Sequence, residues 1–357
     1  MRAILDKEGL TLPPLHFALV SPDQRFPRID AIFEAKWRGH TYRFVAEIKA
    51  RSTPQALVTA AHQAKAYAFD LHGAYPLVIV PYLAPSQVDE AESLGISVVD
   101  LNGNGIVSLE SERVLVSRSG RPNRFRKSEP LRGAYRGTSS LVARALVLRH
   151  QFARVTDLFN FVTAKGGHLT LATVSKALRR LTEDLIVARD ADGLRVLQPI
   201  KLLDRLGNGY RPPRITGRWV GKIPVPADAL HRKLLVAAER AESRLVLTGV
   251  SSASHYTVLA AEPITSFYAS ARPEDLIRAA KLEATSTNTF PNVEILQTDA
   301  EEVFFDLRNE GTHILSSPVQ AWLELSIGDK RLREAGMSLR SKLVNGEPSP
   351  KGERRGD

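Results

Sequence analysis

The sequence of 357 residues contains no cysteine, which excludes disulfide bonds and thiolate metal sites. It has no apolar run near the ~20 residues that span a membrane, because the longest such stretch, Leu77 to Ala84, is only as long as a strand. The amino-terminal residues show no apolar core of a secretory signal. The nine histidines show no metal-ligand spacing. These absences predict a cytoplasmic protein without a membrane partner.

Acidic residues are fewer than basic ones, 39 against 49, which leaves a net charge of +10 and a pI of about 9.8. Such a surplus indicates a polyanionic partner, and DNA is the one expected. Many soluble proteins are nevertheless basic for no specific reason. At 43% hydrophobic and 25% charged residues, the composition is that of a soluble globular protein, and the length allows two or three domains.

A carboxylate and an ammonium group are expected on one face of a strand at residues 42–50. Glu47 and Lys49 stand two positions apart, so their side chains leave a strand on the same side. The alternate positions are apolar and should face a core. These positions are Phe44, Ala46, Ile48 and Ala50.

The residue types near this strand suit hydrolysis of a phosphodiester. That reaction needs a metal to polarise the phosphate, an activated water, and positive charge beside the reacting oxygens. Asp30 and Glu47 are expected as oxygen ligands of Mg²⁺ or Mn²⁺, with the carbonyl of Ile48 as a third ligand. Lys49 would orient the water or stabilise the developing charge.

An alanine-rich helix is expected after residues 52–54, where Ser-Thr-Pro is typical of an N-cap followed by proline at the first helical position. Gln63 and Tyr67 stand four positions apart and share one face of this helix. The candidate catalytic set is therefore Asp30, Glu47, Lys49, Gln63 and Tyr67.

These motifs resemble the PD-(D/E)xK nuclease superfamily, which includes type II restriction enzymes and Holliday-junction resolvases. The helix with Gln63 and Tyr67 is similar to that of RecB-type nucleases. The resemblance covers about the first third of the chain and implies a restriction endonuclease-like mixed sheet and metal-dependent cleavage of DNA. Ile29, rather than proline, precedes Asp30, and the acidic residue that such sites often carry on the first helix has only Asp6 or Glu8 as candidates.

The alternative interpretation of this set is structural. Glu-x-Lys on a strand is common as a solvated charge pair. Folds of this kind are also reused as inert binding scaffolds. The nuclease-like fold and the nuclease activity are therefore separate predictions.

The first domain is predicted to span 1–117. Strand, helix and strand in succession suggest a crossover that closes its sheet, and Asn-Gly-Asn-Gly suggests a hairpin turn after it. The expected elements are strands at 77–80 and 96–101, a helix at 88–94, a turn at 102–105 and a strand at 106–109.

A basic linker is predicted at 118–138, where Gly, Ser and Pro accompany many arginines and a single acid, Glu129. Such a segment cannot bury a core but can follow DNA phosphates. The expected phosphate contacts are Arg124, Arg126 and Lys127.

Residues 139–200 are predicted to form three helices and a β-hairpin. Helices are expected around 141–148 and at 155–162, before a break at Gly166-Gly167. A third helix should begin at the cap Thr170 and bury one apolar face, and a hairpin should then join strands at 186–189 and 194–197. The buried face comprises Leu171, Val174, Leu178 and Leu181.

This order resembles a winged helix-turn-helix domain, in which the third helix enters the major groove and the wing contacts the backbone. The alternative is a structural three-helix unit whose arginines form a solvated face. The expected DNA contacts are Thr173, Ser175 and Lys176 to base edges and Arg179, Arg180 and Arg189 to phosphates.

Residues 201–344 are expected to form an α/β domain. Its segments, which include 244–254, 317–325 and 331–336 and follow the winged helix, resemble AbiEi-like antitoxins and regulators of type IV toxin–antitoxin systems. The resemblance covers roughly the last two-thirds of the chain and implies a transcriptional autoregulator with a nucleotidyltransferase-like C-terminal domain. The expected elements are strands at 245–247 and 293–296 and helices at 232–241 and 274–284.

Nucleotidyl transfer itself is not expected, because Gly249 is followed by Val250 and no paired carboxylates that could hold two metals come after it. The tail at 345–357 is rich in Pro, Gly and charge and is expected to be disordered.

The sequence thus predicts an α/β and α+β multidomain protein with two alternative functions. In the first, the protein is a Mg²⁺-dependent deoxyribonuclease that a winged helix targets to DNA. Cutting both strands would favour a homodimer, since one site cuts one strand. In the second, it is a non-catalytic transcriptional regulator or antitoxin of a type IV toxin–antitoxin or phage-defence system, with a cognate toxin as partner.

Overall fold

The computed structural model describes residue 5 and residues 9–20, 29–109, 114–125, 132–260 and 262–345. Over these residues the chain is a mixed α/β protein with three sheets. It divides into two compact units, Met1–Leu131 with Glu183–Leu185, and Arg132–Thr182 with Ile186–Asp357. None of the described helices is both long enough and apolar enough to cross a membrane. Six features named above lie outside the described residues: Asp6, Glu8, Arg126, Lys127, Glu129 and the tail from 346.

The first unit is built on one mixed sheet whose strands are neighbours in chain order from β1 to β8. Its β4–β5 and β5–β6 pairs are parallel, and each is joined by a helix, the crossover that parallel strands require. The strands are β1 (Leu10–Leu12), β2 (Leu15–Val20), β3 (Ala31–Trp37), β4 (His40–Ile48), β5 (Ala74–Val80), β6 (Val98–Asp100), β7 (Gly105–Leu109) and β8 (Val114–Arg118). The crossover helices are α2 (Pro54–Asp70) and α3 (Pro85–Ser93).

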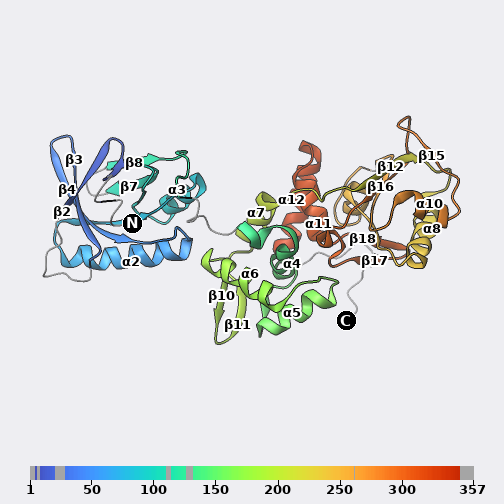
Figure 1. The fold of residues 1–357 in the computed structure, drawn as a ribbon, viewed down its shortest axis with the longest axis horizontal. Coiled ribbons are helices and arrows are strands. Elements are labelled where there is room, and N and C mark those ends of the chain that lie inside the picture. Colours follow the sequence, from blue (N-terminus) through green and yellow to red (C-terminus); the bar gives the residue numbers. More distant parts are fainter. Residues whose placement is uncertain are drawn as a thin grey trace. The chain divides into compact units, whose positions relative to one another are not determined.

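The two faces of this sheet bury separate apolar layers. Phe44 of β4 and Ile79 of β5 pack on one face with side chains of β1, β2 and β3. Val78 and Val80 of β5 pack on the other face against Leu57 of α2 and residues of α3. The helix α2 therefore lies along one face of the sheet (Figure 1). This places the middle of α2 beside the carboxyl end of β4.

Most predicted elements of the first unit are present, with shifted ends. The strand predicted at 42–50 is β4, which ends at Ile48, so Ala50 is exposed instead of facing the core. The helix predicted at 88–94 begins earlier, at Pro85, because the Gln87 side chain accepts a hydrogen bond from the N–H of Ala84 at 2.9 Å. The strand predicted at 96–101 is only Val98–Asp100, and it pairs with β7 in the predicted hairpin.

Part of the predicted linker is hydrogen-bonded to the β6–β7 turn of the first unit. The side chain of Asn104 accepts from the N–H of Arg121 at 2.7 Å and donates to the Arg121 carbonyl at 3.2 Å. The Arg124 guanidinium donates to the carbonyl of Leu101 at 2.8 Å. These contacts tie residues 121–124 to the first unit.

The second unit begins with a segment that has the predicted order of helices and hairpin. A short strand, β9, was not predicted and joins the hairpin in a sheet of order β10-β11-β9. The elements are α4 (Ser140–Leu148), β9 (Gln151–Phe152), α5 (Val155–Ala164), α6 (Leu171–Glu183), β10 (Val187–Asp190) and β11 (Gly193–Val196).

The third helix of this segment, α6, begins as predicted after Thr170, whose hydroxyl accepts from the N–H of Thr173 at 3.2 Å. Val174, Leu178 and Leu181 are buried, as the apolar periodicity predicted. Leu171 is 45% exposed, so its assignment to the buried face was wrong. It stands in the first turn, beyond the part of the helix that packs on the core.

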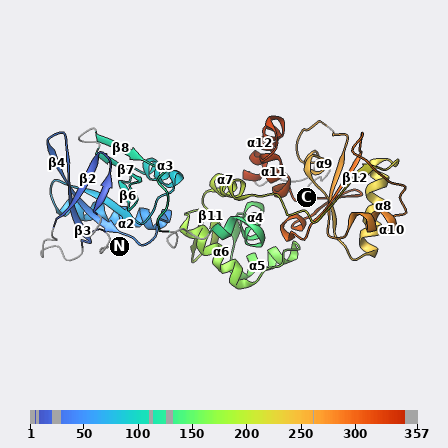
Figure 2. The same cartoon turned by 45° about the horizontal axis from the view of Figure 1, so that its top comes forward.

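The rest of the second unit is a mixed sheet with the strand order β15-β12-β16-β14-β13-β18-β17. The helices α8 and α10 lie side by side on one face (Figures 1 and 2), where Leu234 and Leu276 pack against Phe267 and Ile295. The strands are β12 (Gly217–Lys222), β13 (Leu245–Leu247), β14 (Thr265–Ala269), β15 (Thr285–Ser286), β16 (Val293–Gln297), β17 (Arg308–Glu310) and β18 (His313–Leu315). The helices are α7 (Pro199–Gly209), α8 (Ala227–Arg240), α9 (Gly249–Ala253), α10 (Pro273–Ala279), α11 (Pro318–Ser326) and α12 (Lys330–Val344).

The strands predicted at 245–247 and 293–296 are present as β13 and β16. The helix predicted at 232–241 begins earlier, at Ala227. The helix predicted at 274–284 ends at Ala279, because the chain takes a left-handed conformation at Lys281, where φ is 51°.

Candidate active site

Asp30 lies immediately before β3, at the point where the β3–β4 ladder ends. The pair Ala31 and Ala46 is the last of that ladder, so Ile48 extends beyond it. The N–H of Ile48 donates to Oδ2 of Asp30 at 2.9 Å. The N–H and C=O of one residue in an extended strand point to the same side, so the Ile48 carbonyl faces the Asp30 side as well. The Asp30 carboxylate and the Ile48 carbonyl therefore lie together at the end of the β3–β4 ladder.

Glu47 and Lys49 leave β4 on the same side, as their spacing predicts. Lys49 Nζ lies 3.0 Å from Oε2 of Glu47 and 2.7 Å from Oε1 of Gln63. Glu47 is in register with Val78, whose face packs against α2, and Gln63 stands on that helix. The side chain of Glu47 is 6% exposed and that of Lys49 is 28% exposed. The strand and the helix therefore bring a buried carboxylate, an ammonium and an amide together.

Burial raises the pKa of the Glu47 carboxyl above its usual value, and the negative charge of Asp30 and a hydrogen bond with it raise that pKa further. The hydrogen bond and charge of Lys49 oppose this shift. Because Asp30 acts on Glu47 through its charge and through a hydrogen bond, the two carboxyl groups lie close together. The pair fits a divalent cation such as Mg²⁺ or Mn²⁺, which takes hard oxygen ligands and would neutralise the excess negative charge.

The metal donors at this place would be the carboxylates of Asp30 and Glu47 and the carbonyl of Ile48. Within the described residues, no group of three or more His, Cys, Asp or Glu side chains is placed to hold a metal ion. The candidate set has only two such side chains, and its third protein oxygen would come from the backbone.

Tyr67 stands one turn beyond Gln63 on α2 and packs against an apolar cluster of Ile29, Ile32 and Val45. In the described part of the chain, it makes no hydrogen bond to the other candidate residues. Its position supports the wall of the site beside Asp30. Four of the five predicted residues are thus joined through hydrogen bonds to one another or to β4, and the fifth packs beside them.

The predicted DNA contacts on α6 differ in exposure. Ser175, Lys176 and Arg179 are exposed, and so is Arg189 on β10. Arg180 is half-buried. Thr173 is half-buried, and its hydroxyl lies 3.0 Å from that of the helix cap Thr170.

Arg124, a predicted phosphate contact, directs guanidinium donors to Leu101 and Asn102 of the first unit. Its Nε donates to Oδ1 of Asn102 at 3.2 Å, and its guanidinium lies 5.7 Å from the centre of the Phe125 ring. Arg126 and Lys127 lie outside the described residues.

A histidine cluster in the second unit escaped the sequence analysis. Nδ1 of His231 on α8 lies 2.6 Å from Nδ1 of His313 on β18, and the ring of His255 is 5.5 Å from that of His313. Burial, and then the charges of His313 and His255, lower the pKa of His231 to about 4. No local spacing signals this cluster, because the two bonded histidines are 82 positions apart.

A half-buried carboxylate, that of Glu324, occupies the turn between β13 and α9, where the nucleotidyltransferase resemblance would place a reactive site. The N–H of Gly249 donates to Oε2 of Glu324 at 2.7 Å, and the hydroxyl of Thr248 donates to the same carboxylate at 2.8 Å. Burial raises the pKa of Glu324, against the effect of these donors and of Gln320. The turn is thus filled by a side chain of the protein itself.

Comparisons with protein-family models, with curated proteins and with solved structures find no match to this chain. The functional argument therefore rests on the geometry described above.

Proposed function

We propose that this protein is a DNA-binding nuclease that hydrolyses phosphodiester bonds with a divalent metal held by Asp30, Glu47 and the carbonyl of Ile48. The observation that carries the proposal is the position of Lys49, with Nζ 3.0 Å from Glu47 and 2.7 Å from Gln63. Sequence spacing alone predicted this set, and the fold brings its members together from β4, α2 and the residue before β3.

Each residue has a role in that reaction. Mg²⁺ or Mn²⁺, when bound, would polarise the phosphate and lower the pKa of the attacking water. Lys49 keeps a positive charge beside the position where the phosphate oxygens gain negative charge. Gln63 accepts a hydrogen bond from Lys49 and so holds that ammonium in place. Asp30 is fixed by the N–H of Ile48, which orients its carboxylate.

The second unit supplies the DNA affinity in this proposal. The order α4, β9, α5, α6, β10, β11 is that of a winged helix-turn-helix, with α6 as the helix for the major groove and β10–β11 as the wing. The exposed side chains of Ser175 and Lys176 suit base edges, and those of Arg179 and Arg189 suit phosphates.

Cleavage of plasmid and branched DNA in Mg²⁺ tests the nuclease proposal. Wild type should cut, whereas Asp30→Asn and Lys49→Ala should lose at least about a hundredfold in rate, as removal of one group that stabilises developing charge does elsewhere. Lys36→Ala is the matched control, because Lys36 is an exposed lysine on the neighbouring strand β3. Identical DNA after incubation with wild type and both site variants at high enzyme would end the catalytic proposal.

A second candidate function is a non-catalytic regulator or antitoxin of a type IV toxin–antitoxin system, in which the first unit only adds DNA contacts. The exposed basic face of α6 favours it as much as it favours the nuclease. Sequence-specific binding by wild type without any Mg²⁺-dependent cleavage would select this candidate. Co-purification of one stoichiometric protein encoded next to this chain would identify the cognate toxin.

A further inference from the structure

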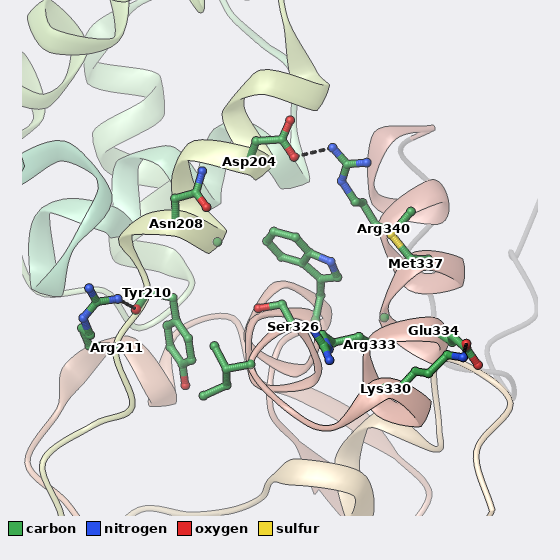
Figure 3. A pocket seen from close by; sticks show the side chains of 14 residues that line it. Asp204, Asn208, Tyr210, Arg211, Ser326, Lys330, Arg333, Glu334, Met337 and Arg340 are labelled. Carbon is green, nitrogen blue, oxygen red and sulfur yellow. Dashed lines mark hydrogen bonds and ion pairs between the residues drawn. The ribbon is translucent and has the colours of Figure 1, made fainter. Parts of the chain in front are cut away.

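A cavity of about 830 Å³ lies in the second unit between α7, the end of α11 and α12 (Figure 3). Small-molecule sites in proteins measure roughly 300–1,000 Å³. Figure 3 shows Asp204 and Asn208 on one side of the cavity and Met337 and Arg340 on the other. An ion pair between Asp204 and Arg340 spans one end of it. The space is thus a wide pocket that remains largely open to solvent.

Large apolar side chains line this cavity. Trp322 packs so closely on α7 that a Cβ atom at Gly207 would lie 3.1 Å from its ring. Ile327 is 52% exposed and Met337 is 60% exposed, although both are large apolar residues. Exposed apolar side chains gathered around one cavity mark a surface that gains free energy when a ligand covers it.

The lining also carries an excess of positive charge. Four cationic residues and two acidic ones line the cavity, and two of the cations, Arg340 and Lys330, pair with the two acids, Lys330 at 3.9 Å from Glu334. The other two cations are Arg211 and Arg333.

These two arginines keep donors available for an anion. Arg211 Nη1 donates to the carbonyl of Tyr210 at 2.8 Å, and Arg333 Nε donates to the carbonyl of Asp329 at 3.4 Å. In the described part of the chain, neither guanidinium pairs with an acidic side chain. A guanidinium has five N–H donors in a planar fork, which suits carboxylate, sulfonate or phosphate oxygens.

We propose that this cavity binds a small organic anion with an apolar body. Its acid group would contact Arg333, on the α12 side of the cavity, and its apolar body would cover Met337, Ile327 and the edge of Trp322. The site is separate from Asp30, Glu47 and Lys49, and its occupation does not depend on nuclease activity.

Two fluorescent probes that share their rings and differ in charge test this proposal on the full chain. The anionic probe is 1-anilinonaphthalene-8-sulfonate, and the neutral one is N-phenyl-1-naphthylamine. Wild type should bind one anionic probe per chain, about tenfold or more tightly than the neutral probe, because charge-assisted hydrogen bonds to a guanidinium are the stronger kind. Equal affinities, or no binding of the anionic probe, would overturn the proposal.

Two variants and a matched control locate the probe. Arg333→Gln should weaken binding of the anionic probe about tenfold and leave binding of the neutral probe unchanged. Arg331→Gln is the control, because Arg331 stands two residues away on α12, pairs with Glu262 at 3.1 Å and does not line the cavity. Met337→Trp should fill the space from its exposed side and block both probes.

The expected melting temperatures of all three variants equal that of wild type, because each replaced side chain is exposed. If Met337→Trp binds the anionic probe with unchanged affinity, the probe binds elsewhere on the protein. An equal loss of affinity for the anionic probe in Arg331→Gln and Arg333→Gln would mean that general surface charge, not this cavity, attracts the probe. Either result would refute the site.

Discussion

Nη1 of Arg144 donates to Oε1 of Gln320 at 2.7 Å, across 176 positions of sequence. Arg144 is a buried residue of α4, and its Nη1 also donates to the carbonyl of Glu302 at 3.0 Å. Gln320 on α11 in turn donates to Oε1 of Glu324 at 2.7 Å. The predicted domains 139–200 and 201–344 therefore share one buried polar network within a single compact unit.

Arg144→Met should lower the free energy of unfolding of the second unit. The variant leaves the buried Gln320 amide oxygen without this donor, which costs about 1–3 kcal/mol, and it also removes the donor to the half-buried Glu302 carbonyl. Arg278→Met is the control, because the Arg278 side chain is 79% exposed, and its effect should stay within about 0.5 kcal/mol. Chemical denaturation, monitored by tryptophan fluorescence, measures the free energy of unfolding of both variants. Equal effects of the two variants would mean that the network adds no stability.

Acid should destabilise the second unit through His231, whose pKa is lowered to about 4 in the folded protein. The unfolded chain has the ordinary histidine pKa of about 6.5, so it binds more protons than the folded one between those values. The stabilisation is complete above pH ~6.5, and roughly 3 kcal/mol of it is lost as the pH falls to about 4. The groups that face His231 are His313, His255 and Asp228, and the Asp228 charge opposes the shift.

His231→Asn should make the stability of the second unit depend less on pH, because the variant has no titrating group at this position. His62→Asn is the matched control, since His62 is an exposed residue of α2. Melting temperatures of wild type and both variants between pH 4 and 7 provide the measurement. A wild-type curve parallel to that of His231→Asn would contradict the assignment.

Mg²⁺ should raise the melting temperature of the first unit, and Glu47→Gln should remove that effect. A ligand at ten times its dissociation constant stabilises a protein by about 1.4 kcal/mol. The raised pKa of Glu47 means that its carboxylate forms at a higher pH than usual, so the Mg²⁺ effect should weaken as the solution becomes acidic. Glu34→Gln is the control, because Glu34 pairs with Arg43 on the neighbouring strands. Equal Mg²⁺ shifts in wild type and Glu47→Gln would exclude metal binding by Glu47.

Arg179→Ala and Arg189→Ala should each weaken DNA binding and reduce its salt dependence. Each phosphate contact contributes about −0.9 to the slope of log affinity against log salt concentration. Arg232→Ala replaces an exposed arginine of α8 and should leave the slope unchanged. Fluorescence anisotropy at several salt concentrations gives the slopes. If all three variants keep the wild-type slope, neither α6 nor β10 contacts phosphates.

Local patterns predicted the elements whose periodicity depends on a single buried face. The apolar spacing of Val174, Leu178 and Leu181 gave α6, and the alternation around Glu47 gave β4. The strands β1 to β3 were not predicted. They pair antiparallel with one another and with β4, and two of these ladders close between near neighbours in the chain, Leu12 with Leu15 and Trp37 with His40.

The candidate site was predictable because its members are close in sequence and are placed by one strand and one helix. The contacts of Asp30 with Ile48, and of Lys49 with Gln63, follow from the β3–β4 ladder and the α2 crossover. The network of Arg144 and Gln320 and the cluster of His231 and His313 depend on the tertiary fold alone. Neither has a local spacing that a sequence pattern could detect.

The hydrogen bonds between Asn104 and Arg121 decide where the first unit can be cut from the rest of the chain. A fragment that ends at Ser117 would remove both backbone partners of the Asn104 side chain and leave its oxygen buried without a donor, at a cost of about 1–3 kcal/mol. A fragment that ends at Phe125 keeps them, together with the contact between Arg124 and Leu101. The amide of one asparagine thus sets the end of the excisable piece, and Phe125 lies eight residues past the domain boundary predicted at 117 and beyond β8.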